Sequence, residues 1–506
     1  MNPLNSIVSA FTIEEQQKFI KFLESKNKRG DTKNVQLFNL LLKTDMSSKA
    51  ICLKLYGSEK RDAYHALRKR LHESVIEFTA NQSLQNENSV EMQIIKYILA
   101  SRSFLIQKQY SEAYNILNKA ELIASEHHMF PLLNEIYHTK IQYAYVYPSA
   151  NLDALIAVFK NNQMNLQLED ELNIVYAKIR MTLNAMEYKA ETLDFQTILQ
   201  NAFKEHNIKM NDALSFKSLY QLVSIASISA FVTKDYLKIE PFLIESYNTL
   251  QQHKKSKKQL YYHIIILYSI ANTLFRNKKF NQSKDFLDLM LNHMNLNNKK
   301  YYKPFILKYK LLLALNLNYN NQQELAIKTL ENVNTKRVTD LENVLDIQLS
   351  LIVFYFQKGA FKNAHKILSK FYHTDSWYTE KAGKEWVIKK NLIEILLHLE
   401  LHNIDLFESR LLSFKRNYFT YLKEIKQQRV ITYLSFVEMY YKNPETVTSE
   451  AFKAKVEKSF DWLETHKEDI FVISFYSWLK GKMNQTDLYA TTMNLINQAQ
   501  KESRTA

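Results

Sequence analysis

Hydrophobic and polar residues recur along most of this chain with the spacing of amphipathic helices. Residues 57–78, GSEKRDAYHALRKRLHESVIEF, separate into two faces when they are wound at about 3.6 residues per turn. One face is basic and carries Arg61, His65, Arg68 and His72. The other is apolar and carries Ala63, Leu67, Leu71, Val75 and Phe78. The pattern predicts a long helix with one packed side and one solvated, positively charged side.

The residues before this helix predict a small helical module over residues 1–85. TIEEQQKFIKFLESK begins with threonine and glutamate at the spacing of a capping box, which indicates a helix start. A second start is predicted at Asp45 or Ser47, and AICLKLYG ends on Gly57, a residue typical of helix C-caps. A short helix, a glycine turn and a longer basic helix together have the outline of a helix-turn-helix.

A helix-hairpin pattern recurs between about residues 90 and 415. The segment 97–120 predicts two helices around a tight turn, and 348–371 repeats its spacing. Weaker copies cover 224–243, 267–290, 312–330 and 393–414. The small-residue position of the second helix falls at Ala113, Ile239, Ser283, Ala326, Ala364 and Phe407. The later positions are 44, 43, 38 and 43 residues apart, and the first interval leaves room for two degenerate copies near 155 and 197.

This pattern resembles the tetratricopeptide repeat (TPR) family. The residues of 97–120 that match its large, small and aromatic positions are Tyr97, Ala100, Ser101, Phe104, Tyr110, Ala113, Leu117 and Ala120. Lys108 replaces the turn glycine of the family, whereas 348–371 keeps it as Gly359 and keeps the small residue as Ala364. The resemblance implies an all-α protein, a right-handed α-solenoid of divergent TPR-like helix hairpins in which the first helices form a concave binding face.

The chain is therefore expected to have three parts: an N-terminal helical module (1–85), the solenoid (86–415) and a C-terminal helical continuation and cap (416–506). Trp462, Phe471 and Trp478 are expected to close the end of the stack, because terminal units must cover an open core. The C-terminal third also resembles TPR-like proteins of the Bacteroidota, which implies a bacterial, cytoplasmic protein and no particular activity.

Composition excludes several classes of protein. The 506 residues include 5 glycines, whereas average usage gives roughly 35, so no phosphate loop or dinucleotide fingerprint can be assembled. Cys52 is the only cysteine, which excludes a disulfide framework and a multi-thiolate metal site. We find no signal peptide, membrane-spanning run or local catalytic motif. We therefore expect a soluble, non-enzymatic protein without a cofactor or metal.

The net charge of +15 is concentrated between residues 251 and 310. Thirteen lysine or arginine residues and two aspartates give this segment a local charge of +11. Such a field favours acidic protein surfaces or nucleic acid as partners. The alternative explanation is a general enrichment of the chain in lysine, asparagine, isoleucine and tyrosine.

Two loops in this segment pair lysines with tyrosines. The loops 253–263 and 297–303 each join one hairpin to the next, which predicts that they emerge on the same edge, whereas the turn at 276–280 points to the opposite edge. The residues predicted to contact an acidic partner or nucleic acid are Lys254, Lys255, Lys257, Lys258, Lys299, Lys300, Tyr301 and Tyr302. The alternative is a pair of solvated loops in which the tyrosines cover the hydrophobic seam.

Two further clusters are candidates for chemistry. Arg61, Arg68, Lys69 and Arg70 could supply donors to phosphates and guanines, although a helix at the start of a solenoid also needs a solvated face. Glu394, His398 and His402 are spaced by four residues and align on a helix, as metal ligands must. However, His398 falls at an aromatic packing position and His402 at a turn, so packing is the favoured interpretation.

The sequence thus predicts a protein–protein or peptide-binding scaffold that uses the concave face of a TPR-like solenoid, with a protein or peptide as its partner. The local positive charge leaves an acidic partner and nucleic acid as options. The alternative is a DNA-binding transcriptional regulator with an N-terminal helix-turn-helix and a TPR-like sensor solenoid.

Overall fold

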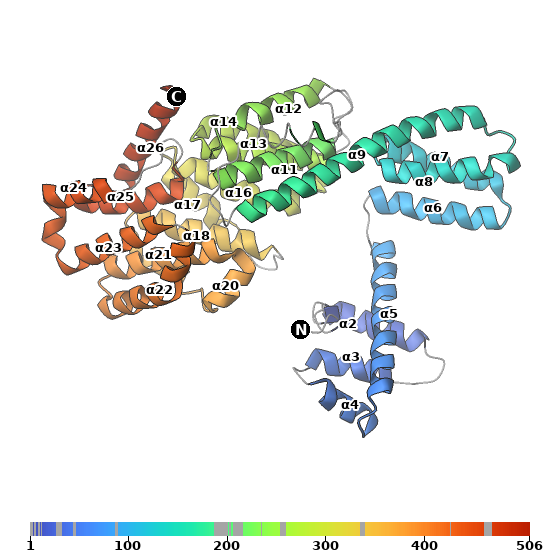
Figure 1. Ribbon diagram of the computed structural model, residues 1–506, viewed down its shortest axis with the longest axis horizontal. Coiled ribbons are helices and arrows are strands. Elements are labelled where there is room, and N and C mark those ends of the chain that lie inside the picture. The colour runs from blue at the N-terminus through green and yellow to red at the C-terminus, as the bar shows by residue number, and fades with distance from the viewer. Residues whose placement is uncertain are drawn as a thin grey trace. The chain divides into compact units, whose positions relative to one another are not determined.

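The computed structural model of the chain is built from helices (Figure 1). It describes residues 4, 7–8, 11, 13–26, 33–43, 47–86, 90–186, 201, 204–205, 216–233, 235–252, 260–333, 340–425, 427–459 and 468–505. These residues contain 24 α-helices and two 3-10 helices, and no strand. The expected all-α class is confirmed. None of the described helices is both long and apolar enough to cross a bilayer.

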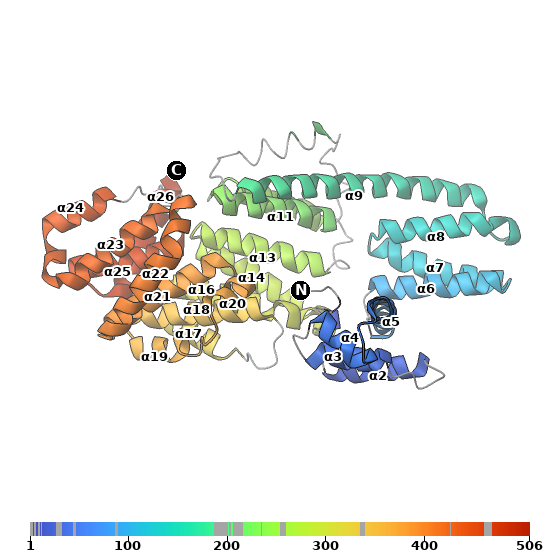
Figure 2. The ribbon, with the colours of Figure 1, turned by 60° about the horizontal axis from the view of Figure 1, so that its bottom comes forward.

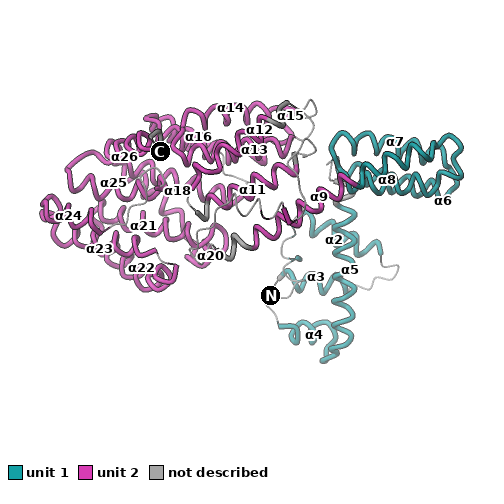
Figure 3. The backbone as a smooth tube through the Cα atoms, turned by 45° about the horizontal axis from the view of Figure 1, so that its top comes forward, with its two compact units in different colours: residues 1–163 teal, residues 164–506 magenta. Residues whose placement is uncertain are grey.

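The chain divides into two compact units, residues 1–163 and 164–506 (Figure 3). The division falls within α9 (Leu152–Met186), a single helix of 35 residues, rather than at the expected boundaries near residues 85 and 415. The first unit contains two hydrophobic cores, one between Leu4 and Phe78 and the other between Ile94 and Tyr137. In the second unit, one core extends from Leu172 to Ile496, so the C-terminal helices share the core of the preceding hairpins.

Four helices surround the first core: α2 (Ile13–Lys26), α3 (Lys33–Lys43), α4 (Ser48–Tyr56) and α5 (Arg61–Asn86). Ser47 caps α4, because its hydroxyl accepts a hydrogen bond from the N–H of Ala50 at 3.3 Å. Gly57 ends α4 at a φ of 68°, and its N–H donates to the carbonyl of Leu53 at 2.8 Å. The predictions of a helix start at Ser47 and of a glycine C-cap are confirmed.

The second core of this unit lies among α6 (Val90–Ile106), α7 (Tyr110–Glu126) and α8 (Phe130–Tyr143), with the first part of α9. The helices α6 and α7 form a hairpin over the segment 97–120. Ala113 and Ala120 are both fully buried in it, as small residues at a close helix contact must be.

The second unit contains four consecutive hairpins, each made of a first and a second helix. Their packing can be followed in Figure 2. These first helices are α13 (Leu260–Arg276), α16 (Tyr302–Asn318), α18 (Leu341–Gln357) and α21 (Lys384–Glu400), and each has 17 residues. The second helices are α14 (Phe280–Met294), α17 (Gln323–Glu331), α19 (Phe361–Leu368) and α22 (Ile404–Glu424). Each hairpin packs on the next. The pair α11 (Phe216–Thr233) and α12 (Glu240–Gln252) precedes them, and short α15 (Leu296–Lys299) and α20 (Asp375–Ala382) lie in the connections.

The small-residue position has a constant place in these hairpins. It is the fourth residue of α7, α14, α17, α19 and α22, and it is 0% exposed in every case: Ala113, Ser283, Ala326, Ala364 and Phe407. The hydroxyl of Ser283 donates to the carbonyl of Ala271 on the first helix at 2.7 Å, so the position faces that helix. The fourth residue of α9 is Leu155, at the copy expected near 155, and it is half-buried rather than fully buried. The copy expected near 197 lies outside the described residues.

Each turn inside a hairpin contains one residue whose backbone has the left-handed conformation. Its φ is 61° at Lys108 and Lys278, 60° at Asn321, 73° at Gly359 and 56° at His402. The following N–H donates back to the first helix, as in Ala360 to Tyr355 and Asn403 to His398, both at 2.9 Å. This is the hydrogen-bond pattern of a Schellman C-cap, which explains why glycine is found at one of these turns.

The chain ends with α23 (Gln428–Lys442), α24 (Glu450–Ser459), α25 (Ile470–Asn484) and α26 (Leu488–Thr505). The expectation that Trp462, Phe471 and Trp478 close the end of the stack needs correction. Trp462 lies outside the described residues. Phe471 and Trp478 belong to α25, which does not stop at the last hairpin and runs back along the earlier ones.

Candidate functional site

The turn of the first of these hairpins is covered by the chain's own C-terminal part. Arg276 forms an ion pair with Asp469, the residue that caps α25. Lys278 donates from Nζ to the backbone oxygen of Glu468 at 3.0 Å, and its side chain is 1% exposed. Burial lowers the pKa of the Lys278 ammonium group to about 8. Arg276 and Lys278 are therefore engaged inside the fold, and Lys279, the third cation of the turn at 276–280, pairs with Glu240.

A buried polar network joins α25 to the next two hairpins. The hydroxyl of Ser474 on α25 lies 3.2 Å from the hydroxyl of Tyr319 and accepts a hydrogen bond from Nε2 of Gln357 at 3.0 Å. Gln357 in turn accepts a hydrogen bond from Nδ2 of Asn318 at 2.9 Å. These partners stand at the ends of α16 and α18. Because a buried polar group is stable only with a partner, the network fixes the position of α25 along these helices.

The same helix reaches the end of α21. The indole N–H of Trp478 donates to Oε1 of Glu400 at 2.6 Å, and Nζ of Lys482 lies 2.7 Å from the same oxygen. Further back on α21, the ammonium group of Lys389 lies 5.0 Å from the centre of the Phe471 ring. The sequence predicts that the first helices form a binding face. In the structure, the C-terminal ends of these helices are in contact with α25.

The beginnings of α13 and α16 carry aromatic rings instead. The Tyr261 ring of α13 lies 5.8 Å from the ring of Tyr301 and 5.4 Å from that of Phe305. Tyr261 is 42% exposed. The two loops expected on one edge are thus adjacent at their tyrosines, on the side of the helices away from the turns.

Exposed lysines stand beside these rings. Nζ of Lys300 lies 5.4 Å from the centre of the Tyr301 ring, and Nζ of Lys299 lies 5.9 Å from that of Tyr302. Both lysines are exposed and both tyrosines are half-buried. The other lysines predicted for this edge, Lys254, Lys255, Lys257 and Lys258, lie outside the described residues. We call the described surface formed by Tyr261, Lys299, Lys300, Tyr301 and Tyr302 the basic–aromatic edge.

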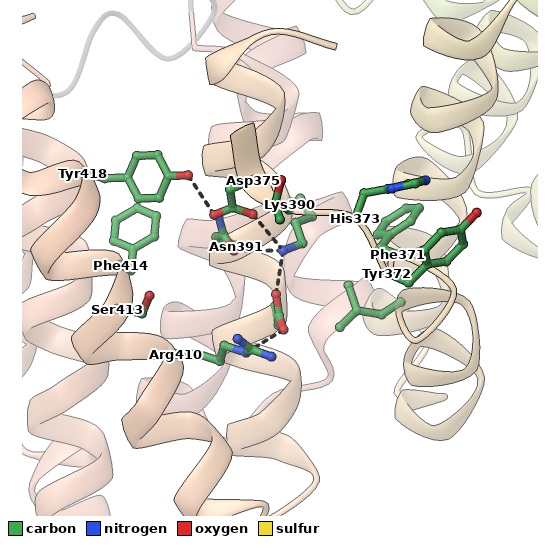
Figure 4. A pocket seen from close by; sticks show the side chains of 13 residues that line it. Phe371, Tyr372, His373, Asp375, Lys390, Asn391, Arg410, Ser413, Phe414 and Tyr418 are labelled. Carbon is green, nitrogen blue, oxygen red and sulfur yellow. Dashed lines mark hydrogen bonds and ion pairs between the residues drawn. The ribbon is translucent and has the colours of Figure 1, made fainter. Parts of the chain in front are cut away.

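A polar pocket of about 340 Å³ opens between α21, α22 and the loop that leads into α20 (Figure 4). Its centre is the carboxylate of Asp375, whose Oδ2 accepts hydrogen bonds from Tyr418 and from Nδ2 of Asn391, both at 2.8 Å. Burial and the neighbouring carboxylate raise the pKa of the Tyr418 hydroxyl, which therefore stays protonated and donates. At the mouth, Tyr372 is 82% exposed.

The charges in the pocket neutralise one another. Nζ of Lys390 lies 2.9 Å from Oε2 of Glu394 and 3.4 Å from Oδ1 of Asp375. Oε1 of Glu394 lies 2.9 Å from Nε of Arg410. Two carboxylates and two cations alternate, so the pocket attracts neither anions nor cations strongly.

The aligned residues Glu394, His398 and His402, considered above as possible metal ligands, have other contacts in the structure. Glu394 is engaged by two cations, and His398 is 4% exposed with Nδ1 3.4 Å from Nδ2 of Asn403. Burial lowers the pKa of His398. His402 is the left-handed turn residue. The described residues contain no group of three or more side chains that could hold a metal ion.

Several cationic side chains of α5 make contacts with neighbouring residues. Arg61 lies 3.5 Å from a carboxylate oxygen of Glu59, and a hydrogen bond from Lys49 lowers the pKa of that carboxyl group. The Arg68 guanidinium lies 5.7 Å from the centre of the Tyr64 ring. Nε of Arg70 donates to the carbonyl of Ala66 at 3.4 Å. Lys69 is exposed.

The sequence did not indicate the pocket or the contacts of α25. Asp375, Lys390, Arg410 and Tyr418 come from three helices, and no local spacing relates them. The aromatic run around residues 371–378 was the one visible signal, since a polar loop rarely carries so many rings.

The chain matches no protein-family model, no curated protein and no solved structure.

Proposed function

We propose that the chain is a non-enzymatic binding scaffold of the TPR-like solenoid type, with a protein or peptide as its partner. The observation that carries this proposal is the set of four packed hairpins with first helices of 17 residues and turns built on one left-handed residue. Stacked hairpins of this kind present an extended surface on which a partner can bind along several units.

One side of the stacked hairpins is available to a partner. The turn side is occupied by α25, whose Trp478 is 2% exposed, and displacing such a helix would expose a large apolar surface. The connections between hairpins lie at the other ends of the first helices. The basic–aromatic edge lies at one connection and the pocket at another, beside α20. Partner binding is therefore assigned to the connection side.

Site-specific photo-crosslinking in a lysate of the native host tests this assignment. The photoreactive residue p-benzoylphenylalanine replaces Tyr261 or Tyr372 on the connection side, and replaces Leu412 as a control. Leu412 is 66% exposed on α22 and serves as an exposed position on a second helix. We expect the same discrete protein to be crosslinked from both connection-side positions and not from Leu412. Equal crosslinking from all three positions, or none from any, would contradict the proposal.

A second candidate function is DNA binding by the N-terminal helices. It is favoured by the connection of α4 to α5 through the left-handed Gly57 and by the exposure of Lys69 and Arg70. The charge-reversal variant Lys69→Glu/Arg70→Glu should then weaken duplex DNA binding and reduce its dependence on salt. An affinity and a salt slope equal to those of the wild type would reject this function.

A further inference from the structure

The lysines after α14 lie in a stretch of the sequence that contains no carboxylates. Residues 289–323 include no aspartate or glutamate, and five lysines lie among them: Lys299, Lys300, Lys303, Lys308 and Lys310. None of the five forms an ion pair with any residue in the described part of the chain. By contrast, Lys279, at the other end of α14, lies 2.7 Å from Oε1 of Glu240. Positive surface charge without nearby carboxylates attracts anionic partners at distances up to the Debye length, beyond which salt screens it.

The rings at this edge provide an apolar component next to the charge. Tyr261 contacts Tyr262, Tyr301 and Phe305 at centroid separations of 5.5, 5.8 and 5.4 Å. Although part of this cluster is buried, Tyr261 remains 42% exposed. Exposed aromatic side chains with a neighbouring polar rim are typical of binding sites for protein segments.

We propose that the basic–aromatic edge binds an acidic peptide segment that also carries aromatic or aliphatic side chains. This inference rests on the proposed binding function and names the chemistry of its partner. The acidic groups pair with Lys299 and Lys300, and an apolar side chain packs on Tyr261.

Two observations favour a peptide over a nucleic acid. The rings pack against one another at interplanar angles of 80°, 56° and 50°, so they do not offer the free parallel faces on which bases stack. The five cations are all lysines, whereas arginine is the residue that forms bidentate contacts with phosphates and guanines.

Fluorescence anisotropy tests the inference with the full chain and a fluorescein-labelled synthetic peptide of glutamate, aspartate and phenylalanine. We expect the wild type to bind, with an affinity that falls as salt is added. The variant Lys299→Glu/Lys300→Glu should bind at least about tenfold more weakly, because two attractive charges become repulsive. Since both lysines are exposed, this variant should retain the fold, which circular dichroism checks. Tyr261→Ala should weaken binding without changing its salt dependence.

A matched control reverses two exposed lysines elsewhere on the same unit. Lys455→Glu/Lys458→Glu on α24 changes the net charge equally and should leave the affinity close to that of the wild type. Equal losses in both double variants would show that only the net charge matters and would overturn the inference. Binding of duplex or single-stranded DNA at the edge, with no binding of the acidic peptide, would also overturn it. In both cases crosslinking from Tyr372 still reports on the broader proposal.

Discussion

The ammonium group of Lys278 donates a hydrogen bond to the backbone oxygen of Glu468, a residue 190 positions later in the chain. The contact joins the turn between α13 and α14 to the start of α25. The side-chain amide of Gln500 on α26 donates a second hydrogen bond, to the carbonyl of Lys278 at 2.7 Å. A lysine in a left-handed turn is thus enclosed by the C-terminal helices. The turn between α13 and α14 and the C-terminal helices of the second unit are therefore held together by residues far apart in sequence.

Replacement of Lys278 by methionine should change how stability depends on pH. Burial lowers the pKa of Lys278 from 10.5 to about 8, so the unfolded chain binds more protons than the folded chain between these values. The wild type should therefore gain stability relative to Lys278→Met as the pH rises from about 7.5 to about 9.5, by about 2 kcal/mol. Urea unfolding at both pH values measures this difference. Tryptophan fluorescence is a suitable signal, because all four tryptophans lie in the second unit.

A constant difference between wild type and Lys278→Met across this pH range would show that the ammonium group is not desolvated in the fold. Tyrosines also titrate at high pH, but they are common to both proteins and cancel in the comparison.

Removal of the Ser474 hydroxyl should loosen the contact of α25 with the hairpins. In Ser474→Ala, Nε2 of Gln357 loses its acceptor at 3.0 Å and keeps only the hydroxyl of Tyr319 at 3.5 Å. Because a buried N–H that loses its acceptor costs about 1–3 kcal/mol, the variant should be less stable. Ser435→Ala is the matched control, since that hydroxyl is exposed and bonds only within its own helix. Urea unfolding followed by tryptophan fluorescence should show the loss in the first variant alone. Equal stability of both variants would contradict a structural role for the network.

Much of the hairpin architecture could be predicted because it is encoded locally. The small residues Ala113 and Ala364 fall at the same place in their hairpins, because the two helices of each hairpin must approach closely there, and Gly359 marks one of the turns. Ser47 and Gly57 were recognisable as caps for the same reason. Each of these signals lies within one hairpin or one helix.

The position of α25 along the hairpins could not be predicted, because the contacts that set it join residues far apart in sequence. Gln357 and Ser474 are 117 positions apart, and Glu400 and Trp478 are 78 apart. Single polar residues of this kind look like ordinary surface positions until the partner helix is in place. The same holds for the pocket, where Asp375 and Tyr418 meet across 43 positions.

Substitutions at the left-handed turn residue should affect stability in opposite directions at two hairpins. Gly359 has a φ of 73° and no atom within 4 Å of a Cβ added to it, so Gly359→Ala tests backbone strain alone. It should cost about 1–2 kcal/mol. His402 occupies the equivalent turn at a φ of 56°, and His402→Gly should stabilise the unit by about 1 kcal/mol because it removes the same strain. Thermal unfolding followed by tryptophan fluorescence measures both. Destabilisation by His402→Gly would show that the histidine side chain makes a contact that outweighs the strain.

Acid should destabilise the packing of α13 through His263. Its Nε2 lies 2.9 Å from the hydroxyl of Tyr247, its ring centre lies 4.1 Å from that of His293, and the side chain is 3% exposed. Burial, with a smaller effect of His293, lowers the pKa of His263 from 6.5 to about 4. Between these values the unfolded chain binds more protons, so stability falls as the pH decreases. The expected loss from about pH 7.5 to about pH 5 is about 2 kcal/mol.

The variant His263→Gln isolates this contribution, because glutamine does not titrate and can still pair with Tyr247. Asp346 acts in the opposite direction, since burial raises its pKa from 3.8 to about 6 and the folded chain then binds the extra proton. Asp346 is present in both proteins, so the difference between them reports on His263. We expect the wild type to lose stability relative to His263→Gln as the pH falls, in urea unfolding at the two pH values. A parallel pH dependence in the two proteins would mean that the imidazole is protonated without penalty and that its enclosure by Tyr247 and His293 does not control stability.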